Sequence, residues 1–343
     1  MIGKMLSQSV LKKHLTKLRK LEKFSYLQVI PSQSIQDVVE RIDKAYKLFF
    51  RNLKHNIKTA PPSFKKVKKY KSFTLKQAGY KILDDNKIKI KNKVYKYSKS
   101  RDFDQDKIKT ITVKRDNLND YWICVTHEIE DTTTDRTMTG EIAGFDFGCQ
   151  VFLTSSDGDD IESPLFFKKN IKKTKGLCKQ LSRKVKGSSG HKRAKFALAR
   201  HHRDMANQRH DFHFKLANDL SRRYDCVFFE DLDMKGMSKK HGKKVHDLGF
   251  SEFVKILSNK SIEHGSYVHK IDRWFPSSQL CSGCGYRNRD LGEWEKVWIC
   301  PECLLKHDRD RNASFNILRE GASSQKNDSQ VNPFAREVLA KCS

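Results

Sequence analysis

The stretch HDRDRNASFNI (307–317) holds two aspartates separated by one arginine, and it begins a few residues after a CPEC sequence. Two further acids stand in apolar surroundings, because Asp146 lies within IAGFDFG and Glu230 ends the run CVFFE. A carboxylate inside an apolar strand is costly unless something pairs with it. These acids therefore indicate a site that binds a cation.

The acids occur in a definite order along the chain. Asp146 lies in a predicted strand, Glu230 ends a later strand, and Asp308 and Asp310 precede a predicted short helix. This is the layout of an RNase H-like nuclease, in which carboxylates hold two magnesium ions for attack by water on a phosphodiester. Magnesium suits such a site because it prefers oxygen ligands and keeps several waters. Any one of these acids taken alone is more often a helix cap or a salt-bridged residue, so the interpretation depends on their joint placement.

Four cysteines have the spacing of a metal site. Cys281 and Cys284 form one CxxC pair, Cys300 and Cys303 form another, and fifteen residues lie between the pairs. This spacing predicts a structural zinc ion held by four thiolates. The intervening loop carries Arg287, Arg289, Trp294 and Trp298, a mixture that suits contact with nucleic acid. Trp298, next to Cys300, is expected instead in the small core around the zinc.

The composition favours a polyanionic partner. The 343 residues include 69 Lys and Arg against 41 Asp and Glu, which gives a net charge of +28 spread along the chain. Such a charge favours nucleic acid binding, although a ribosomal-type or simply soluble basic protein would share it. No apolar run approaches the length of a membrane span, and residues 1–25 are too charged for a signal peptide. The five remaining cysteines are scattered, which indicates a reducing compartment.

The amino-terminal half predicts helices followed by strands. Residues 5–58 have helical periodicity, with a capping box at Ser34 and Asp37, and APPS (60–63) ends the helix. Alternating patterns then predict strands at 87–91, 108–114 and 121–130. The lysines on these strands are compatible with a solvated surface or with contact to phosphate.

From residue 141 the pattern becomes mixed α/β. Strands are expected at EIAGFDFG, VFLTS, CVFFE and YVHKID, with a helix at SEFVKILSNKSIEHG before the last. A long helix over 191–223 has one apolar stripe and a basic remainder. Its candidate phosphate contacts are Lys192, Arg193, Lys195, Arg200, Arg203 and Arg209.

Several blocks together resemble the TnpB (OrfB) proteins of insertion sequences, relatives of the type V CRISPR effectors and of Fanzor proteins. The blocks are GFDFG (144–148), LSRKVKGS (181–188), ARHHRDMANQRHDFHFKL (199–216), FFEDLDMKGM (228–237), WFPSSQLCSGCG (274–285) and CPECLLKHDRDRNASFNILREG (300–321). The resemblance covers residues 30–321 or so. It implies a transposon-encoded, RNA-guided DNA endonuclease, whose partners are a guide RNA from the element's own flank and a target DNA.

The resemblance also implies an α/β multidomain fold. The expected parts are a helical recognition segment (1–60), a β-rich, barrel-like wedge domain (61–140), a RuvC-like nuclease domain (141–273), the zinc ribbon (274–306), a return to the nuclease domain (307–320) and a polar flexible tail (321–343). Carried over by motif, the magnesium-binding acids are Asp146, Glu230 and Asp310. Asp308 is then expected to cap the helix or to orient Arg309.

The chain departs from the family pattern at several points. The amino-terminal strand with which members usually begin is not recognised, so the wedge barrel is expected to lack it. Phe145 and Cys149 replace commoner aliphatic and small residues around the first acid. Leu304 stands at a usual glycine, and Ser314 and Phe315 replace alanines. None of these changes removes a ligand.

Two other functions are compatible with the same residues. One is a truncated or cleavage-inactive DNA- or RNA-binding accessory or repressor protein of a mobile element. The other is a transposase in the literal sense, because strand transfer and hydrolysis differ only in the attacking hydroxyl. The expected location is the cytoplasm or nucleoid in a prokaryote, and the nucleus in a eukaryotic or viral host.

Overall fold

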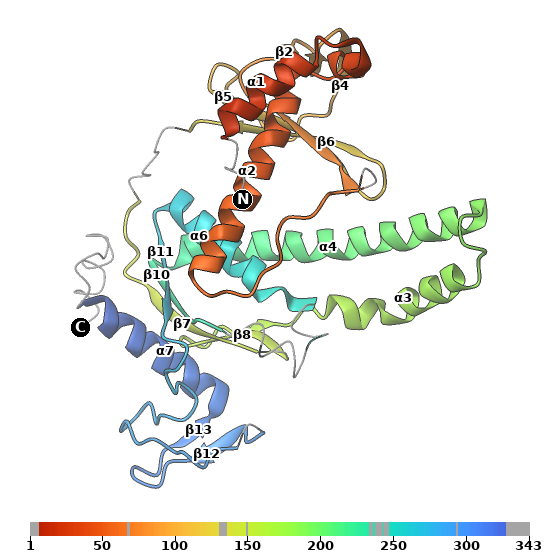
Figure 1. Cartoon of the computed structure of the whole chain (residues 1–343). Helices are drawn as coiled ribbons and strands as arrows, with labels where there is room; N and C mark the ends of the chain where they lie inside the picture. The colour runs from red at the N-terminus through yellow and green to blue at the C-terminus, as the bar shows by residue number, and fades with distance from the viewer. Residues whose placement is uncertain are drawn as a thin grey trace. The chain divides into compact units, whose positions relative to one another are not determined.

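The computed structural model describes residues 7–326 except 67–68, 130–135, 149, 233–235, 237–241, 243–246 and 293. The chain divides into two compact units, Met1–Asp131 and Thr132–Ser343, and both are shown in Figure 1. Within the described ranges, no helix combines the length and the apolar character that crossing a membrane requires.

Unit 1 begins with helices, as the periodicity predicts. They are α1 (Gln8–Leu18), a 3-10 helix (Glu22–Gln28) and α2 (Ser32–Lys54). The predicted capping box is wrong, because α2 begins two residues earlier than Ser34 and has Pro31 as its N-cap. Asp37 pairs with Arg41 at 2.7 Å instead. The apolar stripe of α2 is buried at Ile35, whereas Ile42 and Leu53 are exposed.

Six short strands complete unit 1. They form two separate three-stranded antiparallel sheets, with the orders β1-β5-β6 and β2-β3-β4. Their bounds are β1 Ser72–Leu75, β2 Tyr80–Leu83, β3 Lys87–Ile90, β4 Lys93–Lys96, β5 Ile108–Arg115 and β6 Tyr121–His127. The three predicted strands correspond to β3, β5 and β6, and the core contains Leu75, Ile88 and Ile111.

A mixed five-stranded sheet is the centre of unit 2. Its order is β11-β10-β7-β8-β9, in which β7, β10 and β11 are parallel and β8 and β9 are antiparallel to their neighbours. The strands are β7 Ile142–Phe147, β8 Val151–Ser155, β9 Ile161–Glu162, β10 Cys226–Glu230 and β11 Tyr267–Ile271. Four of them match the predicted strands.

The two faces of this sheet are covered by different helices (Figure 1). On one face, Ala143, Phe145, Phe147, Val227 and Phe229 pack in a large apolar cluster with α4 (Ser189–Arg223) and α6 (Phe250–His264). On the other face, Cys226 and Phe228 pack with Ile317 of α7 (Arg309–Lys326). Because side chains alternate along a strand, Asp146 and Glu230 belong to the face that α7 covers.

Two helices in unit 2 differ from the sequence-based expectation. α3 (Phe166–Ser182) packs against α4, as Figure 1 shows, in a basic region for which no helix was expected. α7 runs to Lys326, so residues 321–326 are helical and their assignment to a flexible tail is wrong. Residues 327–343 of that predicted tail lie outside the described residues.

Candidate functional site

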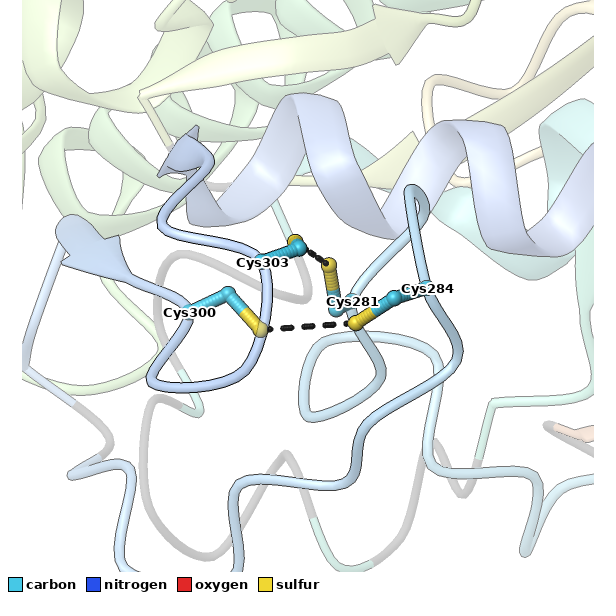
Figure 2. A group of neighbouring side chains, drawn as sticks. All are labelled: Cys281, Cys284, Cys300 and Cys303. Atoms are coloured by element: carbon cyan, nitrogen blue, oxygen red, sulfur yellow. Dashed lines mark hydrogen bonds between the residues drawn. The ribbon is translucent and has the colours of Figure 1, made fainter.

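The four cysteines converge as their spacing predicts. Their sulfur atoms all lie within 4.8 Å of one another, and Figure 2 shows the side chains of Cys281, Cys284, Cys300 and Cys303 facing each other from two loops. The shortest separations are 3.5 Å, between Cys281 and Cys303 and between Cys284 and Cys300. Four thiols in this arrangement could hold a metal ion by tetrahedral coordination.

The environment of the cysteines favours ionised sulfur at one position. Burial acts to raise the pKa of Cys300, but hydrogen bonds from the backbone amides of Cys303 and Glu302 outweigh it and lower that pKa to about 7. A thiolate is the form of cysteine that binds metals. Cys300 is therefore partly deprotonated at neutral pH.

A small core supports the cysteine cluster. Trp298 is buried, as predicted, and packs with Cys281 and Cys300. Strands β12 (Val297–Ile299) and β13 (Lys306–Asp308) place Trp298 opposite His307. The ring of His307 lies 4.7 Å from that of Trp298, and its Nε2 lies 3.0 Å from Cys281 Sγ. Burial lowers the pKa of His307, so the ring is neutral.

Leu304, which replaces a usual family glycine, has a backbone φ of 59°. This left-handed conformation favours glycine, so the structure explains why the family pattern has glycine there. The side chain of Leu304 is exposed, and the Leu304 amide still donates to the Cys300 carbonyl at 2.9 Å. The departure thus leaves the turn of the second cysteine pair intact.

Two of the predicted acids lie on adjacent parallel strands. The last paired position of β7 and β10 is Phe145 opposite Phe229, and Asp146 and Glu230 are the next residues on each strand. Both residues are half-buried. The sheet register therefore brings these two carboxylates to the same edge.

Besides burial, the negative charge of Asp310 contributes to a raised pKa of Asp146. Burial raises the pKa of Asp146 to about 8, and the negative charges of Asp310 and Glu230 contribute to the increase. Burial also raises the pKa of Glu230 to about 7. Three segments far apart in the sequence thus place carboxyl groups close enough to repel one another, which a bound cation would relieve.

Asp310 itself is held by two cations of the chain. Its carboxylate contacts Lys296 Nζ at 2.5 Å and Arg309 Nη2 at 3.0 Å. Burial acts to raise the pKa of Asp310, but the hydrogen bonds from Lys296 and Arg309 outweigh it and lower that pKa. Among the described residues, the four cysteines are the only group of three or more possible metal ligands whose atoms all lie within 4.8 Å of one another, so the three acids are more widely spaced than the thiols.

Asp308 caps α7, one of its two expected roles. Its Oδ1 accepts hydrogen bonds from the backbone amides of Asp310 at 3.1 Å and Arg311 at 3.0 Å. Arg311 in turn donates to the Ser155 carbonyl and to Asp160, both at 3.0 Å. The first turn of α7, which carries Asp310, is therefore attached to the end of β8.

Close packing of α7 on the sheet depends on a glycine. A Cβ at Gly144, on β7, would lie 2.4 Å from the Ser314 carbonyl oxygen and 2.5 Å from the Leu318 amide nitrogen. Only glycine tolerates this approach of two backbones. Gly144 thus allows α7 to lie against the strand that carries Asp146.

The predicted nucleic-acid contacts differ in their surroundings. Exposed side chains are found at Lys192, Arg193, Lys195, Arg200, Arg287 and Arg289, whereas Arg203 and Arg209 are half-buried. Arg209 lies 3.4 Å from Glu252 and donates to the Asp247 carbonyl, so it joins α4 to the α6 region. Arg287 donates to Gln279 at 3.2 Å. The exposed residues of α4 are the ones best placed to meet phosphate.

A pocket of about 270 Å³ adjoins the second acid. Its lining includes Glu230 and Lys270 from the sheet and Lys255, Ser258 and Asn259 from α6. Lys270 also pairs with Asp231 at 3.3 Å. A space with hydroxyl, amide and ammonium groups beside a carboxylate could receive part of a phosphate-containing chain.

Two family models match parts of the chain. Residues 123–241 match the family model described as "Probable transposase" (OrfB of IS605), and residues 250–317 match "Cas12f1-like, TNB domain". The chain is therefore similar to OrfB proteins over part of its length. A Streptomyces pristinaespiralis protein named "Putative RNA-guided DNA endonuclease" is 34% identical to this chain over 217 residues, which are 63% of this chain and 53% of that protein.

A second relative is aligned over more of its length. The Escherichia coli protein named "Putative RNA-guided DNA endonuclease InsQ" is 29% identical over 315 residues, 86% of this chain and 76% of that protein. This chain spans only about half of the length of the Streptomyces relative. Its fold is similar to that of Cas12f1 solved with sgRNA and target DNA, with a TM-score of 0.51, 15% identity, and coverage of 92% of this chain and 76% of the other.

Several site residues were not found from the sequence. Lys296 contacts Asp310 from fourteen positions earlier, and Asn312 and Asn316 bond to the backbone next to Cys281. The only sequence signal was that both asparagines fall within the block DRDRNASFN, at a spacing of one helical turn. A side chain that bonds to a distant backbone leaves no periodic pattern to detect.

Proposed function

We propose that this chain is a transposon-encoded, RNA-guided DNA endonuclease with a RuvC-like set of three carboxylates. The observation that carries the proposal is the parallel register of β7 and β10, which brings Asp146 and Glu230 to the same edge of the sheet, on the face covered by α7, whose first turn contains Asp310. Acids from β7, β10 and the start of α7 influence one another at a single sheet edge. The mixed sheet, with acids on the central strand β7 and on its parallel neighbour β10, supports the RNase H-like interpretation.

The chain's own residues provide a suitable site for divalent cations. Asp146, Glu230 and Asp310 would hold them, and repulsion among these acids favours cation binding. Magnesium bound there would polarise the phosphate and lower the pKa of an attacking water. Arg309 and Lys296 share Asp310 in the structure, and both side chains can contact phosphate once the carboxylate binds a cation.

The cysteine cluster and the exposed basic residues would bind zinc and nucleic acid. We assign zinc to the four cysteines, because a four-thiolate set with no open position is typical of structural zinc. The net charge of +28 supports binding to guide RNA and target DNA. Exposed basic residues of α4 and the ribbon's Arg287 and Arg289 are the proposed phosphate contacts. The printed names of the relatives support the RNA-guided activity.

A cleavage experiment tests the proposal. The chain would be expressed with the DNA that flanks its gene, its bound RNA sequenced, and magnesium-dependent cutting measured on matched and mismatched targets. Asp146→Asn, Glu230→Gln and Asp310→Asn should each abolish cutting and retain binding of RNA and DNA. Binding without cutting by the unmodified chain would favour the accessory or repressor function, and cutting by all three variants would refute the assignment of the acids.

A further inference from the structure

One buried amide connects α7 to the cysteine cluster. Asn312 is 2% exposed, its Nδ2 donates to the Leu280 carbonyl at 2.6 Å, and its Oδ1 accepts from the Ser282 amide at 2.9 Å. Leu280 and Ser282 are the two neighbours of Cys281. The Asn312 side chain therefore binds the backbone on both sides of a metal ligand.

A second amide on the same helix strengthens this contact. Asn316, 4% exposed, lies one turn after Asn312, and residues four apart share a helix face. Its Nδ2 donates to the Leu280 carbonyl at 2.7 Å and to the Ser277 carbonyl at 2.8 Å. The first cysteine loop is thus attached to two successive turns of α7.

The second cysteine loop reaches Asp310 by another route. Cys300 follows β12, which pairs with β13, the strand that leads directly into α7. The Arg309 amide donates to the Lys296 carbonyl at 2.7 Å. Through His307, β13 also contacts Cys281 Sγ at 3.0 Å. Asp310, between β13 and Asn312, is therefore held by both loops.

This arrangement is more than a means of satisfying polar groups. Two polar side chains on one face of α7 hold the short loop that contains Cys281, and metal binding at such a loop is generally coupled to its folding. Asp310 is two residues from Asn312, and its carboxylate can ligate a cation only if the first turn of α7 keeps its position. A change at Cys281 would reach Asp310 through the hydrogen bonds of Asn312 and the backbone of the first turn of α7.

We infer that Asn312, supported by Asn316 and His307, is a positioning residue that makes divalent-cation binding at Asp146, Glu230 and Asp310 depend on zinc at the four cysteines. The inference rests on the proposed function. Because coupling between two binding sites is reciprocal, cation binding at the acids also strengthens zinc retention.

Manganese binding to the full chain measures the coupling without any cleavage assay. Mn²⁺ affinity would be determined by electron paramagnetic resonance for the zinc-loaded protein and after chelation of zinc, with Asp310→Asn used to identify the signal from the acids. Manganese has little preference for thiolates, so it reports the carboxylates. Zinc removal should weaken Mn²⁺ binding about tenfold, within the usual range for coupled sites.

Substitution of Asn312 separates positioning from general stability. In zinc-loaded Asn312→Leu, Mn²⁺ affinity should fall about as far as after zinc removal from the unmodified chain, and chelation should then have little further effect. Asn312→Asp keeps the acceptor for the Ser282 amide. Its Mn²⁺ affinity should therefore lie between those of the unmodified and the Asn312→Leu protein. Asn170→Leu is the matched control, because its amide bonds within α3, to the Phe166 carbonyl at 2.9 Å. Asn170→Leu should leave the Mn²⁺ affinity unchanged, both in the zinc-loaded protein and after chelation of zinc.

The outcomes distinguish the inference from the proposed function. If the unmodified zinc-loaded chain shows no Mn²⁺ signal that depends on Asp310, the assignment of the acids is wrong. If that signal is present and zinc removal leaves its affinity unchanged, the acids are correct and the coupling is refuted. Equal Mn²⁺ affinities in unmodified and Asn312→Leu protein would likewise refute the role of Asn312. The comparison of zinc-loaded and zinc-free protein needs no change at Asn312, so it is decisive even if Asn312→Leu fails to fold.

Discussion

Lys296 Nζ lies 2.5 Å from Asp310 Oδ2 and so connects the zinc-ribbon segment to the third proposed acid. Lys296→Gln should tighten Mn²⁺ binding roughly two- to fivefold, because a partly exposed ion pair of this kind stabilises by at most about 1 kcal/mol. The ammonium competes with the cation for the same carboxylate. Isothermal titration calorimetry of both proteins would measure the change.

Lys306→Gln is the control for this substitution. Lys306 is exposed on β13, close in sequence to Asp310. The Lys306→Gln substitution should change Mn²⁺ affinity less than Lys296→Gln does. Weaker binding in Lys296→Gln would show that the ammonium supports the cation site instead of competing with it.

Proton release should accompany cation binding. The pKa of Asp146 is raised to about 8 and that of Glu230 to about 7, so near neutral pH these carboxyls hold protons that a cation must displace. Mg²⁺ affinity should therefore rise from pH 6 to pH 8.5. Titrations in buffers of different ionisation enthalpy would count the protons released.

The same raised pKa values affect the stability of the metal-free chain. A carboxyl with a raised folded-state pKa stabilises the fold below its unfolded pKa, and this contribution is lost as the pH rises through 7 and 8. In denaturant titrations without magnesium, the free energy of unfolding of Asp146→Asn should therefore fall less with rising pH than that of the unmodified chain.

For the Mg²⁺ titrations, an affinity that does not change with pH would contradict the shared acid site.

Two glycines of unit 2 should respond in opposite directions to alanine. Gly144→Ala places a methyl group 2.4 Å from the Ser314 carbonyl, and it should destabilise the protein by about 3 kcal/mol because α7 must move away from β7. Gly176→Ala, on exposed α3 with open space around it, should stabilise by about 0.5 kcal/mol or more.

Urea unfolding followed by far-ultraviolet circular dichroism would measure both glycine variants. If Gly144→Ala is as stable as the unmodified chain, α7 does not pack on β7 as closely as described. Loss of Mn²⁺ binding in folded Gly144→Ala would further show that this packing places Asp310.

The exposed start of α4 should account for part of the salt dependence of nucleic-acid binding. Replacing Lys192, Arg193 and Lys195 by glutamine should reduce the slope of log affinity against log salt by about three if each contacts a duplex phosphate. Fluorescence anisotropy with a labelled duplex at several salt concentrations would give the slope.

Lys215→Gln on the same helix serves as the control. Its ammonium is 2.8 Å from Asp211, so its loss should change the slope little. An unchanged slope in the triple variant would remove the start of α4 from the binding surface.

The sequence alone predicted the parts of the site that have a local pattern. Apolar runs gave β7 and β10, CxxC spacing gave the cysteine cluster, and motif resemblance distinguished Asp310 from Asp308, which the structure shows as a cap. The α3 helix was missed because its many lysines obscure a weak apolar stripe. The capping box at Ser34 failed because Pro31 already starts the helix.

Contacts between distant backbones could not be predicted in the same way. The need for Gly144 follows from how closely α7 approaches β7, and the roles of Asn312 and Lys296 follow from how the ribbon folds back onto that helix. These contacts depend on how distant segments are placed in the folded chain, so no periodic pattern in the sequence indicates them.

The most direct test of the account is to locate manganese in crystals of the zinc-loaded chain by anomalous diffraction. The account predicts anomalous density between Asp146, Glu230 and Asp310, with Lys296 displaced from the Asp310 carboxylate. Manganese bound elsewhere, or the three carboxylates without density between them at saturating manganese, would contradict it.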